Sequence, residues 1–249
     1  MCTLVLLRRL GHEWPLILGA NRDEMVGRPW KAPGRHWDDR PNVVAGLDEL
    51  AGGSWLGVND EGVFAAILNR VGTLGPAAGK RSRGELVLDA LDHADAVAAA
   101  AALVDIEPTA YRPFNLLVAD NRDAFWLAHR GNGPVVMTRV TDGLHMLTAR
   151  ELDDPASPRI RRYRERFAGA VPPDPSKGDW QAWQDLLGDS VPGDGEPAES
   201  AMRFSRPDGF ATVSSALVAL PELGKKIQPV GRFASVAGQP SAWGPLGTP

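Results

Sequence analysis

Short apolar runs separated by turn residues fill the first part of the chain. Runs of this length, bounded by Gly, Asn and Asp, predict buried strands joined as hairpins. The turn Asn59–Gly62 ends in a glycine, which can adopt positive φ at no steric cost. The two predicted hairpins pair residues 2–9 with 15–20 and residues 53–58 with 63–68.

The rest of the chain alternates between groups of strands and groups of helices. Ser82–Glu85 has the spacing of a capping box and predicts a helix through Leu91, followed by a second helix over the Ala-rich stretch 95–104. Ser157 and Asp179 predict two further helix starts, the first over 158–168. The remaining predicted strands are 114–119, 124–129, 135–139, 144–147, 211–219 and 226–236, and the predicted loops are 27–42 and 190–209.

The order of these elements bears on the fold class. Strands and helices come in blocks and do not alternate regularly, which disfavours a parallel doubly wound sheet. We therefore predict an α+β fold with two antiparallel sheets and outer helix layers, a four-layer αββα sandwich. No linker or repeat divides the 249 residues, so we predict one domain over 1–249, with 239–249 as an irregular tail.

Composition excludes several classes of function. The formal net charge is −4 and the cations are dispersed, which argues against a nucleic-acid partner. The chain has no apolar run long enough to span a membrane, and the run Leu4–Leu7 is too short for the core of a signal peptide. We expect a cytoplasmic protein without a transmembrane segment.

The single cysteine, Cys2, is the most informative residue, and it excludes an intrachain disulfide. Removal of Met1 would give Cys2 a free α-amino group with a pKa of about 7.7–8.0, able to act as the base for its own thiol. The alternative is that Cys2 is a small core residue. The histidines have no metal-ligand spacing, so we expect no metal: His12, His36, His93, His129 and His145.

A series of short motifs around Cys2 carries a family resemblance. The chain resembles the NRDE family, the group of the transport and Golgi organisation proteins, and through it the choloylglycine hydrolases and penicillin V acylases. Those enzymes are N-terminal-nucleophile hydrolases that begin with a nucleophilic cysteine and cleave linear amides. The motifs are Asn21–Glu24, Gly52–Gly57, Asn59–Gly62, Asn69, Ser82–Glu85, Phe114–Leu116 and Leu152–Pro155.

The resemblance implies roles for individual residues. Cys2 matches the nucleophile, Asp23 matches the aspartate that binds the α-amino group, and Asn69 matches a donor of the oxyanion hole. Asn115 is a second candidate donor. Arg22 is the cation we expect beside the thiolate, although the arginine of the hydrolases aligns with Ala20. Val213 stands where the resemblance leads us to expect a basic residue.

Two functions remain open at this stage. The first is a Cys2-dependent amidohydrolase that acts on a small amide or acyl compound and requires no cofactor. The second is a non-catalytic protein that binds haem or an acyl lipid in the same pocket for trafficking. In both cases the partner is a small-molecule substrate or a hydrophobic ligand.

Overall fold

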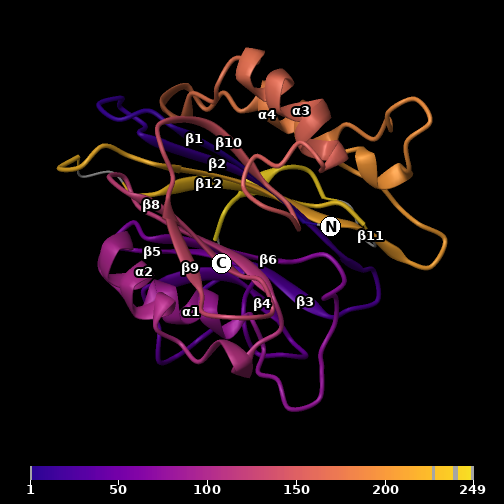
Figure 1. The fold of residues 1–249 in the computed structure, drawn as a ribbon. Helices are drawn as coiled ribbons and strands as arrows, with labels where there is room; N and C mark the ends of the chain where they lie inside the picture. The colour runs from indigo at the N-terminus through magenta and orange to yellow at the C-terminus, as the bar shows by residue number, and fades with distance from the viewer. Residues whose placement is uncertain (1, 226–227, 238–240, 248–249) are drawn as a thin grey trace. The chain divides into compact units, whose positions relative to one another are not determined.

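The computed structural model describes residues 2–225, 228–237 and 241–247. The chain forms two compact units, one from the described parts of 1–28, 142–219 and 230–246, the other from those of 29–141, 220–229 and 247–249. Each unit contains one antiparallel sheet with a pair of helices (Figure 1). The predicted α+β class with two antiparallel sheets is confirmed.

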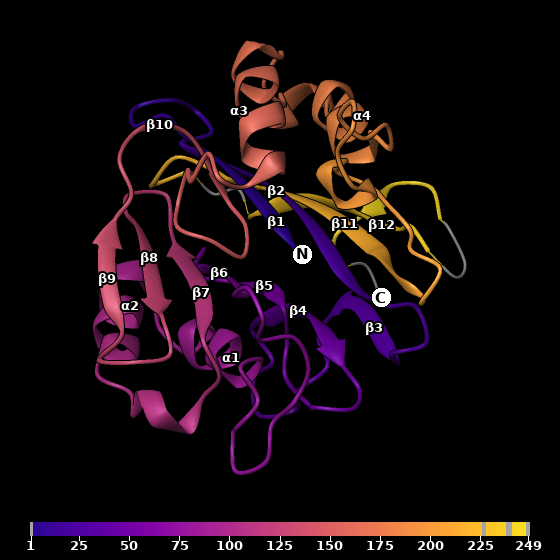
Figure 2. The same cartoon turned by 45° about the vertical axis from the view of Figure 1, so that its right-hand side comes forward.

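The first unit is built on a six-stranded sheet in the order β10-β1-β2-β11-β12-β13. α3 packs on β10 and α4 on β2, so both helices cover this sheet (Figure 2). The strands are β1 (Thr3–Arg8), β2 (Leu16–Met25), β10 (Gly143–Leu147), β11 (Phe210–Leu220), β12 (Val230–Ser235) and β13 (Gly244–Pro245), and the helices are α3 (Pro158–Gly169) and α4 (Gln181–Gly188).

Aromatic side chains fill the space between the first sheet and its helices. Trp183 of α4 is fully buried and packs edge-to-face on Phe167 of α3, with ring centroids 5.2 Å apart. Gly19 of β2 faces Trp183, and a Cβ at this position would come within 3.2 Å of the indole ring. The glycine therefore allows α4 to approach the strand closely.

The second unit is built on a seven-stranded sheet in the order β3-β4-β5-β6-β7-β8-β9. α1 contacts β5 and β6, and α2 contacts β7, β8 and β9. The strands are β3 (Trp30–Gly34), β4 (Val43–Asp48), β5 (Leu56–Asn59), β6 (Phe64–Asn69), β7 (Phe114–Ala119), β8 (Ala124–His129) and β9 (Val136–Arg139), and the helices are α1 (Glu85–Leu91) and α2 (Ala96–Val104).

Several local predictions need correction. Residues 27–42 are not all loop, because β3 lies within them as an edge strand. The prediction of a capping box is wrong. Gly84 is the N-cap of α1 and makes no side-chain cap hydrogen bond. The Glu85 carboxylate pairs with Arg81 at 2.7 Å. The tail contains β13, while its positions 239–240 and 248–249, Met1 and the strand positions 226–227 lie outside the described residues.

The motifs Gly52–Gly57 and Ser82–Glu85 meet inside the second unit. The Ser54 N–H donates to the Gly84 carbonyl at 3.0 Å, and a Cβ on Gly53 would stand 2.5 Å from the Gly84 carbonyl carbon. Only glycine fits at position 53 without displacing that backbone. These contacts hold the start of α1 against the segment that precedes β5.

Candidate functional site

Cys2 lies directly before β1 and is held by the backbone of β2. The Asp23 N–H donates to Cys2 Sγ at 3.4 Å, and the thiol donates to the Asp23 carbonyl oxygen at 3.6 Å. The pairing of Thr3 with Asn21 fixes this register. The antiparallel hairpin therefore brings the first residues of the chain to the strand that carries Asn21–Glu24.

The environment of Cys2 disfavours the thiolate. Burial raises the pKa of the Cys2 thiol, and the negative charge of Asp23 raises it further. The positive charge of Arg22 lowers the pKa but does not reverse the shift. The thiol therefore needs a base near it to become a nucleophile at neutral pH.

The Asp23 carboxylate is completely buried and bound at both oxygens. Arg159 Nη1 donates to Oδ2 at 2.7 Å, and the Thr212 hydroxyl donates to Oδ1 at 2.8 Å. Arg159 also donates to Thr3 Oγ1 at 2.8 Å and, through Nε, to the Ala201 carbonyl at 2.7 Å. A buried Asp–Arg pair is tolerated because further hydrogen bonds such as these offset the loss of hydration.

Sequence reasoning missed Arg159. It is the second residue of α3 and, together with Tyr163 and Phe167, forms the buried stripe of that helix at a spacing of four residues. An arginine in line with an apolar stripe was the available signal. Val213, where we expected a cation, is a buried residue of β11, and the cation next to its neighbour Thr212 comes from α3 instead.

Arg22 lies on the opposite face of β2 from Asp23, because side chains alternate along a strand. It is buried, and its guanidinium stands 4.0 Å from the Glu24 carboxylate. Cys2 precedes Thr3, whose strand partner Asn21 is the neighbour of Arg22 in the sequence, so Cys2 and Arg22 lie at the same end of this hairpin. Arg22 is thus placed where its charge acts on the thiol.

Asn69 and Asn115 belong to the second unit and lie on neighbouring strands. Asn69 pairs with Phe114, and Asn115 pairs with Leu68. Directly opposed residues share a face, so Asn69 lies on the face of Phe114, which packs in the apolar cluster with α1 and α2. Asn115 lies on the other face, and the two amides therefore cannot line one face of this sheet together.

The Asn115 side chain has a fixed orientation. It is completely buried, and its Oδ1 accepts hydrogen bonds from Arg70 Nη1 at 2.6 Å and from Trp126 Nε1 at 3.2 Å. Because two donors hold the carbonyl oxygen, the Nδ2 group points away from them. These two hydrogen bonds hold the amide in one orientation.

Two other features are absent from the described part of the chain. No cluster of three or more His, Cys, Asp or Glu side chains that could hold a metal ion occurs among the described residues. No helix within the same residues has the length and apolar character needed to cross a bilayer.

Comparisons with known proteins agree with the motifs. A family model described as Transport and Golgi organisation 2 matches residues 1–215. The human transport and Golgi organization protein 2 homolog is 36% identical over 144 residues, which cover 53% of this chain and 51% of the human protein. The bovine homolog is 38% identical over 121 residues, covering 44% and 40%. The chain thus spans about half the length of the curated relatives it matches.

Solved structures identify the fold. An N-acylethanolamine-hydrolyzing acid amidase ortholog from Caenorhabditis elegans has a TM-score of 0.60 at 13% identity and covers 90% of this chain and 94% of its own. The R18L variant of a conjugated bile acid hydrolase from Clostridium perfringens has a TM-score of 0.60 at 12% identity, covering 99% and 92%. The predicted N-terminal-nucleophile hydrolase fold is confirmed.

Proposed function

The chain belongs to the Transport and Golgi organisation 2 family, and on this premise and its hydrolase fold we propose that it is an amidohydrolase whose nucleophile is Cys2. The substrate is a small amide or related acyl compound, and no cofactor takes part. The observation that carries the proposal is the hold of β2 on Cys2: the Asp23 backbone binds the sulfur while Arg159 and Thr212 fix the Asp23 carboxylate.

The reaction starts with removal of Met1, which frees the α-amino group of Cys2. That amine takes the thiol proton, and the thiolate attacks the substrate carbonyl to give a tetrahedral intermediate. The C–N bond then breaks, the proton passes to the leaving amine, and the acyl group remains on sulfur as a thioester. Water, deprotonated by the same amine, hydrolyses the thioester and restores the thiol.

The residues around Cys2 serve these steps. The Asp23 carboxylate orients the α-amino group and stabilises its protonated form, and the ion pair with Arg159 keeps the carboxylate in place. The positive charge of Arg22 stabilises the thiolate as it forms. Burial raises the pKa of the thiol and so makes its deprotonation at neutral pH unfavourable. A base within the same residue makes this proton transfer easier.

The oxyanion of the tetrahedral intermediate needs N–H donors, and we assign Asn115 to this role, because Asn69 lies on the opposite face of the same sheet. A single donor is typically worth about 2.7–4 kcal/mol of transition-state stabilisation. The anchoring of Asn115 Oδ1 by Arg70 and Trp126 supports Asn115 as the stronger candidate. The role of Asn115 presupposes that the 249 residues act as one domain, which we also propose, in the cytoplasm.

A non-catalytic role is the second candidate. The raised pKa of the Cys2 thiol favours it, since a protonated thiol can line a pocket without reacting, and the name of the curated relatives points to transport. In this case the site around Cys2 would hold haem or an acyl lipid without turnover.

Turnover of a panel of amides, esters and thioesters separates the two candidates. For an enzyme, Cys2→Ser abolishes turnover, and Asn115→Ala lowers kcat about 100-fold or more, while ligand affinity is kept. Asn132→Ala, at an exposed position, is the matched control and leaves turnover unchanged. If no Cys2-dependent turnover is found and haem or an acyl-coenzyme A binds with micromolar affinity, the protein is a carrier and the proposal of an enzyme is rejected.

A further inference from the structure

A pocket of about 490 Å³ lies in the first unit, next to the Asp23–Arg159 pair. Its lining includes Phe204 and Thr212. The Arg159 guanidinium lies over the Phe204 ring, 5.2 Å from the ring centroid. Thr212 donates a hydrogen bond to the Asp23 carboxylate. The side chains of Phe204 and Thr212 therefore separate the pocket from the buried Asp23–Arg159 pair.

The lining has two kinds of surface. Ala211, Val236 and Ala237 form apolar walls together with the Phe204 ring. Hydroxyl groups and the Arg203 guanidinium supply the polar lining. Volumes of roughly 300–1,000 Å³ with an apolar lining and a few polar groups are typical of small-molecule sites.

Arg203 is distinguished from its neighbours by its charge balance. Arg161 pairs with Glu196, and Arg206 pairs with both Glu199 and Asp208. The Arg203 guanidinium is exposed and makes one long hydrogen bond to a backbone carbonyl, that of Val236 at 3.4 Å. Within 2–225, 228–237 and 241–247, Arg203 has no carboxylate partner, so its positive charge is available to a ligand.

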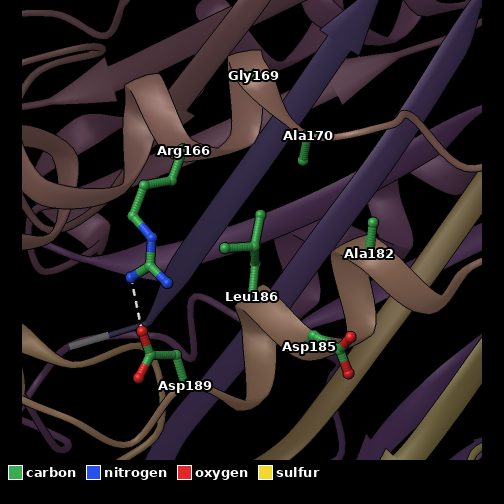
Figure 3. Close-up of a pocket in the computed structure, with 7 residues that line it drawn as sticks. All are labelled: Arg166, Gly169, Ala170, Ala182, Asp185, Leu186 and Asp189. Atoms are coloured by element: carbon green, nitrogen blue, oxygen red, sulfur yellow. Dashed lines mark hydrogen bonds and ion pairs between the residues drawn. The ribbon is translucent and has the colours of Figure 1, made fainter.

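The pocket between α3 and α4 provides a contrast (Figure 3). It is larger, about 640 Å³, but its cation Arg166 is bound to the Asp189 carboxylate at 2.6 Å, and Asp185 also lines it. An anion entering that pocket would meet two carboxylates and a neutralised arginine. An arginine alone therefore does not make an anion site, and Arg203 differs because no carboxylate opposes it.

We propose that the Arg203 pocket, meaning the cavity lined by Arg203, Phe204 and Thr212, binds a small anion with a compact apolar body. The carboxylate or phosphate head pairs with Arg203, and the body packs on Phe204 and the alanines. Charge-assisted hydrogen bonds from Arg to such heads are short and strong, and the apolar walls gain from burial. The site is a binding site in its own right and does not depend on turnover at Cys2.

Calorimetric titration with a matched series of probes tests the proposal. The series is 4-phenylbutyrate, 4-phenylbutyl phosphate, the uncharged 4-phenyl-1-butanol and the cationic 4-phenylbutylamine. We expect at least one anion to bind about tenfold more tightly than the alcohol and the amine, as for one charge-assisted contact. The anion that binds more tightly identifies the head group.

Three variants locate the binding. Arg203→Gln should remove the tenfold preference for the anion, and Ala237→Leu, which fills the cavity, should weaken the anion and the alcohol alike. Arg161→Gln changes the net charge equally but lies at a carboxylate-paired arginine, and it should leave affinity unchanged. Equal losses in Arg203→Gln and Arg161→Gln, or an alcohol that binds as tightly as the anions, would overturn the proposal, as would no binding of any probe.

Discussion

Arg159 Nη1 donates a 2.7 Å hydrogen bond to the carboxylate of Asp23, a residue 136 positions earlier in the chain. Both side chains are buried, so this ion pair ties α3 to β2 beneath the segment that holds Cys2. The consequences of this relationship can be measured without knowledge of the substrate.

Loss of the arginine should strongly destabilise the protein. Arg159→Ala removes the cation that pairs with the buried Asp23 carboxylate, and removal of one partner of a buried pair typically costs about 3–5 kcal/mol. Urea unfolding measures this loss. Arg161→Ala, which removes an exposed pair on the same helix, should cost less than about 1 kcal/mol. Equal losses in the two variants would contradict the structural role of Arg159.

The Thr212 hydroxyl should contribute on its own. Thr212→Val keeps the shape but removes the donor to Asp23 Oδ1, and a hydrogen bond to a charged group contributes about 1.5–3 kcal/mol. The free energy of unfolding should fall by this amount. Thr138→Val on the exposed strand β9 is the control, and it should change stability by less than about 0.5 kcal/mol.

The reactivity of Cys2 should depend on pH in a defined direction. Because burial and Asp23 raise the pKa of the thiol, iodoacetamide should alkylate the folded chain at pH 7.5 more slowly than the urea-unfolded chain. Arg22→Gln removes a charge that lowers the pKa and should slow the folded chain further, whereas Arg122→Gln on an exposed turn should not. Faster alkylation in the folded state would refute this description of the thiol.

The same shift predicts how stability depends on pH. A thiol that ionises less readily when folded stabilises the fold below the pKa of the unfolded thiol, and this contribution is lost as the pH rises. The free energy of unfolding should therefore decrease above about pH 8.5. Cys2→Ser should flatten this part of the stability curve, and an unchanged slope in that variant would exclude Cys2 as its source.

Close packing at Gly19 gives a prediction for the first unit. Gly19→Ala places a Cβ 3.2 Å from Trp183 and 3.4 Å from Leu187, and overpacking of this kind costs about 1–3 kcal/mol. Gly188→Ala, at a position with open space around it, is the matched control. Thermal unfolding should show a lower Tm for the first variant and no decrease for the second.

The sequence predicted those elements whose local pattern agrees with their tertiary environment. β7 and β8 were predicted at their observed bounds, because two apolar runs flank a turn in which the Asp120 carboxylate accepts the N–H groups of Arg122 and Asp123. β3 was missed since Pro33 and Gly34 are typical of loops, although an edge strand tolerates a proline.

The site was less accessible to sequence reasoning because its key contact is non-local. Cys2, Arg22 and Asp23 lie close together through a hairpin that the apolar pattern predicts. Arg159 enters from a helix far along the chain, where an arginine ordinarily faces water. The capping box failed for a related reason, since Glu85 is used by Arg81 and not by the helix start.

Mass spectrometry of the purified protein tests the central claim most directly. The intact mass should equal that of the chain without Met1, and brief incubation with an activated acyl ester should add one acyl group to the peptide that begins with Cys2. Cys2→Ser should abolish this adduct, and Asp23→Asn should slow its formation. Retention of Met1 in most of the protein, or acylation elsewhere but not at Cys2, would contradict the proposed N-terminal nucleophile.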